Sequence, residues 1–265
     1  EAGTALTTGD FNTALGFAAL DAAVLVNNNI AVGSASLSTN VHSSKNVAIG
    51  ANSLEAHNLS SAGDGYNTAV GYNAGLSVTT GERNTFIGAL SADALTDADF
   101  NVAVGWGALT TDTLGSNSTA VGYRSLANST FTTATNTFNV AVGYQSGVAV
   151  TTGIRNTLIG GLAGDALTTG DRNVAVGYTT LSSDTAGRKS TAIGYQALLS
   201  QNFSTTTESF NTAVGYDAGN AVTTGVQNTL IGALAGDVLT DADYNVAMGV
   251  LALTSDTLGS RSTAM

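Results

Sequence analysis

The sequence predicts an all-β fold: a parallel β-solenoid, or β-roll, of about fourteen 17- or 21-residue coils in a 72-residue super-repeat. Three observations support this prediction. A five-residue unit, Asn-Thr-Ala-Val-Gly or a close variant, recurs along the whole chain. The 265 residues include 32 Gly and no Pro, and the many Val, Ile and Thr residues favour strands. The period is too short for helical-hairpin repeats, which take about 33–47 residues.

The glycine that closes each unit sets the coil length. The first four of these glycines are Gly16, Gly33, Gly50 and Gly71, so their numbers rise by 17, 17 and 21, and steps of 17, 17, 17 and 21 then recur. A 17-residue coil suits two short strands and two turns, and glycine ends a strand where a positive φ costs little. We therefore expect one continuous repeat region over residues 1–265, as a segment of a longer fibre.

The asparagine that opens each unit is expected to stack on its counterpart in the next coil. Asn67, Asn84 and Asn101 follow one another at 17-residue intervals. Such ladders form hydrogen bonds along the stack. The absence of Pro agrees, because every stacked strand must donate backbone hydrogen bonds.

The alternation of side chains within the unit predicts how it packs. Positions two and four are Thr, Val, Ile or another large apolar residue, and they share one face of the strand. Position three faces the other way and is mostly Ala, but once in each super-repeat it is large, as Phe86, Leu158 and Leu230. A strand apolar on both faces is usually buried on both. We expect one face to fill the core and the Ala face to meet further copies, most simply in a homotrimer. A wider monomeric solenoid is the alternative.

Two stretches of the chain resemble known repeats. Residues 46–53, Asn-Val-Ala-Ile-Gly-Ala-Asn-Ser, look like the repeat of trimeric autotransporter adhesin heads, which are left-handed parallel β-rolls. The longer form, residues 67–88, is similar to repeats of phage tail-fibre proteins and large bacterial surface proteins. The resemblance covers nearly the whole chain, although its coils are longer than the typical adhesin coil. It implies a structural or adhesive fibre, extracellular on a cell or virion surface, that attaches to a host.

Charge and composition exclude several partners. Eight basic residues stand against nineteen acidic ones, for a net charge of −11, which is too acidic to neutralise nucleic-acid phosphates. No apolar run of about 18 residues exists, so we expect no membrane insertion in this segment. The expected partners are further copies of the chain and a cell-surface glycan or receptor.

No catalytic, cofactor-binding or metal-ligating residue is assigned, and we expect no enzyme activity and no cofactor. His42 and His57 are interpreted as exposed turn residues without a role, and the chain has no Cys. Nucleophilic catalysis would need a base beside a nucleophile, and no such arrangement is evident.

A monomeric solenoid that binds calcium or ice is the alternative function. For calcium, Asp97 and Asp99 are expected to lie near Asp112 after stacking, but the Gly-Gly-x-Gly-x-Asp pattern is absent. For ice, an exposed Thr is needed at one place on successive coils. Thr79-Thr80 recurs only one super-repeat later, and we interpret the ladder as broken in the coils between.

The 21-residue coils, called long coils below, are the expected place for specificity. Their extra residues fall within 54–66, 126–138 and 198–210, and these segments close with Tyr66, Phe138 and Phe210. The hypothesis is that they contact a glycan or a neighbouring fibre, because binding residues concentrate on loops held by a rigid scaffold. The alternative is that they are tolerated insertions. Aromatic residues that follow the unit's Gly, such as Trp106, are expected to stack as a ladder.

Overall fold

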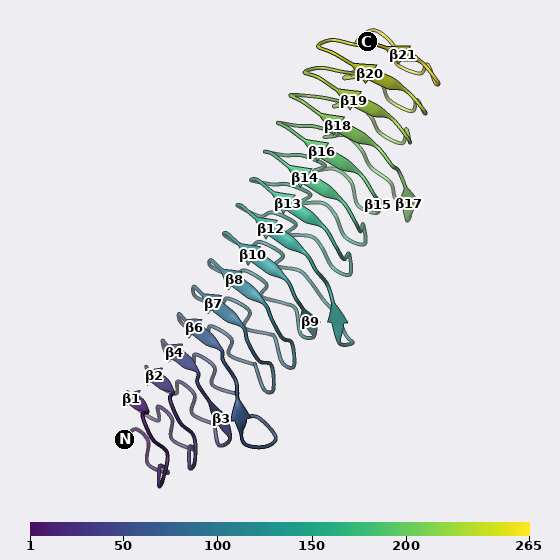
Figure 1. Ribbon diagram of the computed structural model, residues 1–265. Helices are drawn as coiled ribbons and strands as arrows, with labels where there is room; N and C mark the ends of the chain where they lie inside the picture. The colour runs from purple at the N-terminus through teal and green to yellow at the C-terminus, as the bar shows by residue number, and fades with distance from the viewer. The chain divides into compact units, whose positions relative to one another are not determined.

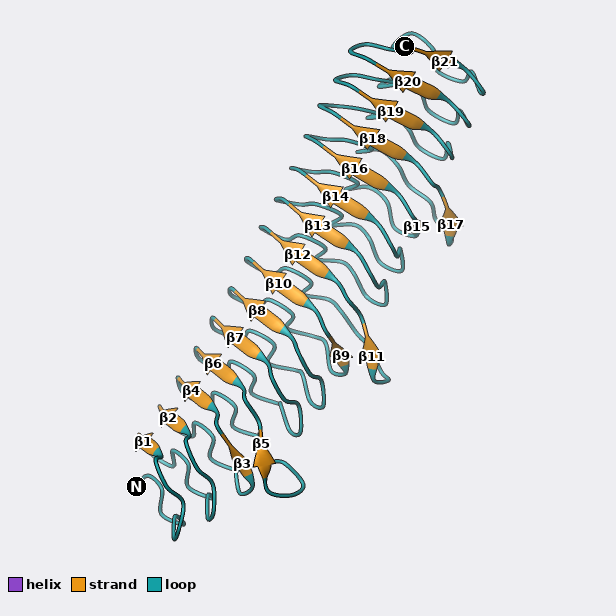
Figure 2. Cartoon of the chain, in the orientation of Figure 1, coloured by secondary structure: helices purple, strands orange, loops and turns teal.

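The structure is a computed structural model that describes all residues, 1–265, and it contains strands and turns but no helix. It has two compact units, Glu1–Thr137 and Phe138–Met265. Each unit is a parallel β-solenoid whose strands lie one above the next (Figures 1 and 2). The predicted fold class is confirmed, with about fifteen coils where about fourteen were predicted.

The first unit stacks seven three-residue strands. They are β1 (Thr13–Leu15), β2 (Ile30–Val32), β4 (Val47–Ile49), β6 (Thr68–Val70), β7 (Thr85–Ile87), β8 (Val102–Val104) and β10 (Thr119–Val121). Each strand pairs in parallel with the same positions of the next coil, so that Phe86 lies beside Ala103. This register follows directly from the repeated Gly spacing.

The second unit stacks eight strands in the same way. They are β12 (Val140–Val142), β13 (Thr157–Ile159), β14 (Val174–Val176), β16 (Thr191–Ile193), β18 (Thr212–Val214), β19 (Thr229–Ile231), β20 (Val246–Met248) and β21 (Thr263–Ala264). The short strand β21 forms the additional coil, which the Gly spacing does not mark.

The asparagine ladder is confirmed and has a defined hydrogen-bond pattern. The Asn67 Oδ1 atom accepts a hydrogen bond from the Asn84 backbone N–H at 2.9 Å. The Asn84 Nδ2 atom donates to the Ala98 carbonyl at 2.8 Å. Both amides thus join their own coil to the coil after it, because the oxygen accepts from the backbone of the next asparagine and the nitrogen donates to a turn carbonyl just before that asparagine. These bonds satisfy polar groups that would otherwise be costly to bury.

The glycine at the end of each strand is required by its conformation and by its surroundings. Gly88 has a φ of +127°, and a Cβ atom built there would lie 2.6 Å from the Gly105 carbonyl oxygen of the next coil. A side chain would therefore meet both backbone strain and a collision.

The core lies between the main sheet and the opposite wall of each coil, and position three of the unit points into it. Ala103, Phe86 and Leu158 are fully buried. In most coils the volumes at two core places are matched: Ala103 is followed six residues later by Leu109, but Leu158 is followed by Gly164. A Cβ atom at Gly164 would lie only 2.8 Å from Leu158 Cδ2.

This packing corrects the assignment of the two strand faces. The prediction that the Ala face meets further copies is wrong, because a narrow core takes the small position-three side chains. Positions two and four face outward instead, where Ile87 is 42% exposed and Ile49 is 39% exposed. The structure holds no helix that is long and apolar enough to cross a membrane.

Candidate binding surfaces

The outward face of the main sheet carries two rows of uncharged side chains in each unit. None of the fifteen strands contains Asp, Glu, Lys or Arg. In the first unit, position two is Thr, Val or Ile, and position four is Leu, Val or Ile. A strand of three residues is about 10 Å long and coils stack about 4.8 Å apart, so seven coils expose on the order of 300 Å². A patch of about 300–600 Å² is the largest that an ordinary monomer exposes, and it is often functional, so this face is a candidate interaction surface.

The three long coils each add a small second sheet, visible beside the main sheet in Figure 2. The pairs are β3 (Ser43–Ser44) with β5 (Gly63–Asp64), β9 (Gly115–Ser116) with β11 (Thr135–Asn136), and β15 (Gly187–Arg188) with β17 (Thr207–Glu208). The predicted segments are thus confirmed as excursions from a regular coil. Leu59, Phe131 and Phe203, which correspond in the three super-repeats, are buried at the start of each excursion.

Each long coil contains a buried polar side chain, and for one of these, His57, the predicted exposure is wrong. His57 is fully buried, not an exposed turn residue, and its Nε2 atom lies 2.9 Å from Ser43 Oγ. Burial lowers the pKa of His57 to about 4. The corresponding residue of the next super-repeat is Ser129, and that of the third is Gln201, both buried. Polar residues such as Ser and Gln are mostly exposed in proteins, so the sequence carried no signal of this burial.

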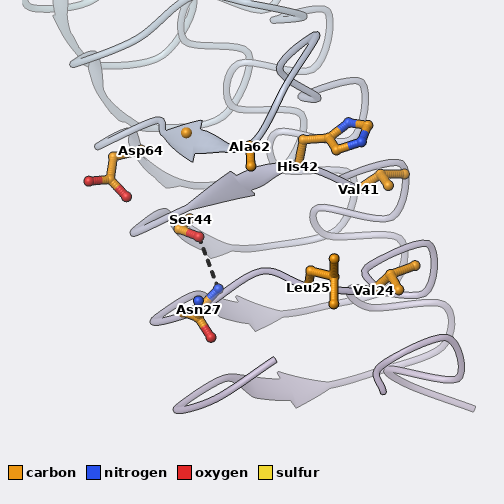
Figure 3. A pocket seen from close by; sticks show the side chains of 9 residues that line it. Val24, Leu25, Asn27, Val41, His42, Ser44, Ala62 and Asp64 are labelled. Carbon is orange, nitrogen blue, oxygen red and sulfur yellow. Dashed lines mark hydrogen bonds between the residues drawn. The ribbon is translucent and has the colours of Figure 1, made fainter. Parts of the chain in front are cut away.

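A hollow of about 370 Å³ lies beside the first long coil. Figure 3 shows Asn27, Ser44 and Asp64 toward one end of its surface, and Val24, Val41 and His42 toward the other. Leu25, Ala62 and Gly63 complete the lining. The apolar part comes from turns at which other super-repeats carry polar residues: positions 24, 25 and 41 correspond to Thr96, Asp97 and Thr113.

Most polar side chains around the hollow form a protein hydrogen bond through one polar atom and leave a second polar atom without one. The His42 Nδ1 atom lies 3.1 Å from the Leu59 carbonyl, so it carries the proton and leaves Nε2 as an acceptor. The Asp64 Oδ2 atom accepts hydrogen bonds from Lys45 at 2.7 Å and from Tyr66 at 3.0 Å. The Lys45 ammonium lowers the pKa of the Asp64 carboxyl and offsets its charge.

A column of aromatic and cationic side chains passes the base of the long coils. These residues precede the opening Asn of each unit and have positive φ values. Lys45 lies 5.1 Å from the Tyr66 ring centroid, Arg83 lies 5.5 Å from that of Phe100, and Lys189 lies 4.9 Å from that of Phe210. Tyr66 and Phe210, two of the three aromatic residues that close the long-coil segments, therefore take part in cation–π contacts.

The predicted aromatic ladder exists as short stacks. Trp106 and Tyr123 stack at 5.2 Å, and Tyr195 stacks on Tyr216 at 5.3 Å with ring planes only 6° apart. The rings remain about half exposed. Because stacked rings cover one another's faces, this ladder offers mainly ring edges to solvent.

The aspartates considered for calcium do not converge. No group of three or more His, Asp or Glu side chains is placed to hold a metal ion. Asp99 Oδ1 accepts the Glu82 backbone N–H at 2.7 Å, and Asp112 Oδ1 accepts that of Gly115 at 3.1 Å. These carboxylates are used to join coils and to cap turns.

The interpretation of the turn threonines as a broken ladder is only partly right, because from Thr79 onward the row runs unbroken through the regular coils, and it stops at the long coils, where Asn58 and Asn202 take the place of Thr. Thr79, Thr96 and Thr113 stack directly, and the Thr79 and Thr96 hydroxyls donate to the carbonyls of the next coil at 3.3 and 3.0 Å. The pattern is interrupted at Val24 and Val41, where the hydroxyl is absent. Since the ladder hydroxyls donate within the protein, this row is a structural feature of the turn.

Comparisons of the chain with protein-family models, with curated proteins and with solved structures found no match.

Proposed function

We propose that this chain is a structural and adhesive fibre segment, without enzymatic activity, from a phage tail fibre or a bacterial surface adhesin. It would lie outside the cell, on a cell or virion surface, and mediate attachment to a host. The observation that carries the proposal is the outward face of the main sheet. It is uncharged over every coil of both units, and it is the face that two or three copies can cover.

Self-association through this face is the first part of the proposal. The β-branched side chains at positions two and four form a flat, regular surface with low side-chain entropy, which favours packing against an identical surface. A homotrimer matches the adhesin repeats that residues 46–53 resemble. The extra residues of the long coils lie away from the outward face of the main sheet. They therefore stay free for contact with a glycan or receptor.

The test is the mass in solution, measured by light scattering after size-exclusion chromatography. We expect the mass of three chains. Val104→Lys with Val121→Lys should give a monomer with an unchanged circular dichroism spectrum, because two charges cannot be buried without partners. Thr132→Lys with Thr133→Lys adds the same charge on an exposed loop and should leave the trimer intact. A monomeric wild-type chain would refute self-association.

Ice binding by a monomer is a second candidate, which one observation favours. Thr68, Thr85 and Thr119 place hydroxyl and methyl groups in the outward row of the first unit, among apolar side chains. A flat face of that kind can order water. Inhibition of ice recrystallisation by a monomer, lost in the Val104→Lys and Val121→Lys variant, would favour this candidate over the fibre.

A further inference from the structure

We propose that the hollow beside the first long coil binds a neutral sugar that carries a methyl or acetamido group. This inference deepens the proposed attachment role and rests on it for its biological meaning. The hollow of about 370 Å³ falls at the small end of the range for ligand sites and has room for one or two sugar rings.

The apolar wall indicates a ligand with an apolar substituent. Val24 and Val41 replace threonines of the turn ladder, and the hydrogen bond that Thr79 makes to the next coil cannot form at Val24. Leu25 is 64% exposed and stands where other super-repeats carry Thr or Asp. This turn gives up a hydroxyl and leaves leucine largely exposed, which creates a surface that a methyl group can contact.

The polar rim indicates the hydroxyl groups of a neutral ring. The His42 Nε2 atom and the Asp64 Oδ1 atom accept no protein hydrogen bond, and the Asn27 Nδ2 atom donates none. The Ser44 hydroxyl accepts the Asn27 backbone N–H at 3.0 Å and keeps its own proton to donate. These groups supply acceptors and donors in one cluster, as sugar recognition requires.

Charge selects a neutral ligand over an ionic one. The Asp64 carboxylate is paired with Lys45, so neither side chain is left to hold a free cation or anion. The chain carries a net charge of −11, which disfavours sialic or uronic acids. The apolar wall disfavours sugars with hydroxyl groups only, such as glucose.

The experiment is saturation-transfer-difference NMR on the full chain with two matched pairs of probes. L-Fucose is compared with L-galactose, which has a hydroxyl in place of hydrogen on carbon 6, and N-acetylglucosamine is compared with glucose. We expect contact from the methyl protons of one substituted sugar, with a Kd on the order of millimolar. The matching unsubstituted sugar should bind at least fivefold more weakly.

The variant Val24→Thr with Leu25→Asp provides the decisive control. It installs the residues found at positions 96 and 97, which fold in the same place of the second super-repeat. Its thermal midpoint and solution mass should match those of the wild type, while binding falls about tenfold. Equal binding by the variant, or no contact from either substituted sugar at about 50 mM, would overturn the proposal. The fibre proposal fails separately, through the mass of the wild-type chain.

Discussion

The second and third long coils each follow a regular coil that holds a buried aspartate, Asp112 and Asp184 respectively. The hydrogen bonds of these two carboxylates are completed differently. In both, one carboxylate oxygen caps the turn by accepting a backbone N–H three residues later. The other oxygen of Asp184 accepts from Gln201 Nε2 at 2.6 Å, whereas Asp112 Oδ2 has no partner. Ser129 stands where the third coil has Gln201. The repeat thus preserves the backbone cap and leaves the second oxygen to a side chain that varies between super-repeats.

The largest effect is expected from Gln201→Ser, which gives the third long coil the residue of the second. The change removes hydrogen bonds from Gln201 to Asp184 and to Ser190, and from Asn211 to Gln201. Each buried group left without a partner costs about 1–3 kcal/mol, so we expect a loss of roughly 2–5 kcal/mol in the free energy of unfolding. Urea denaturation followed by circular dichroism measures it. Ser204→Ala, on the exposed loop nearby, is the control and should have no effect.

A comparable effect is expected at the first long coil, where His57 occupies the place of Gln201. Because the folded pKa of about 4 lies below the ordinary 6.5, the unfolded chain binds more protons between these values. Stability should therefore fall as the pH drops from 6.5 toward 4, by about 3 kcal/mol over the full range.

His57→Gln, which copies the third long coil, isolates this contribution. The difference between wild type and variant in the urea midpoint should shift in favour of the variant between pH 7.5 and pH 4.5. A difference that does not change with pH would show that His57 is not buried in the neutral form.

The opposite pH dependence is expected at Asp112. Burial raises the pKa of this carboxyl above its ordinary value of 3.8. The folded chain then binds more protons just above pH 3.8, and the ionised form is disfavoured at neutral pH. Asp112→Asn copies Asn40, which accepts the Ser43 N–H at 2.8 Å and donates to the Ser43 carbonyl at 2.8 Å.

We expect Asp112→Asn to stabilise the protein by about 1–2 kcal/mol at pH 7, with a gain that shrinks as the pH approaches 4. Thermal unfolding at both pH values measures this. The variant Ser129→Gln, which supplies the missing partner instead, should also stabilise at pH 7. Destabilisation by both changes would contradict the comparison of the two coils.

The sequence predicts the length and position of the coils well, but it does not predict which side chains fill their core. Gly spacing locates every regular coil except the last one, which β21 forms, and the 72-residue period locates the long coils. Both succeed because backbone geometry repeats with the residues that permit it. The pattern within a strand could not tell inside from outside, since both faces are apolar. The missing signal was the volume match six residues later, as between Leu158 and Gly164. The hollow beside the first long coil could not be predicted, because it depends on how a single loop folds back over two turns.

The smallest effect is expected from the pair of polar side chains at the base of each long coil. This pair differs between the first long coil and the second. Lys45 and Asp64 form an ion pair at 2.7 Å, while Asn117 donates to Asn136 at 3.0 Å in the equivalent place. Lys45→Asn with Asp64→Asn copies the neutral pair into the first long coil. Exposed ion pairs contribute little and are screened by salt, so the urea midpoint should hardly change and should depend slightly less on salt. A clear loss of stability in the double variant, at low and at high salt alike, would show that the charged pair fixes the first long coil and that the two pairs are not equivalent.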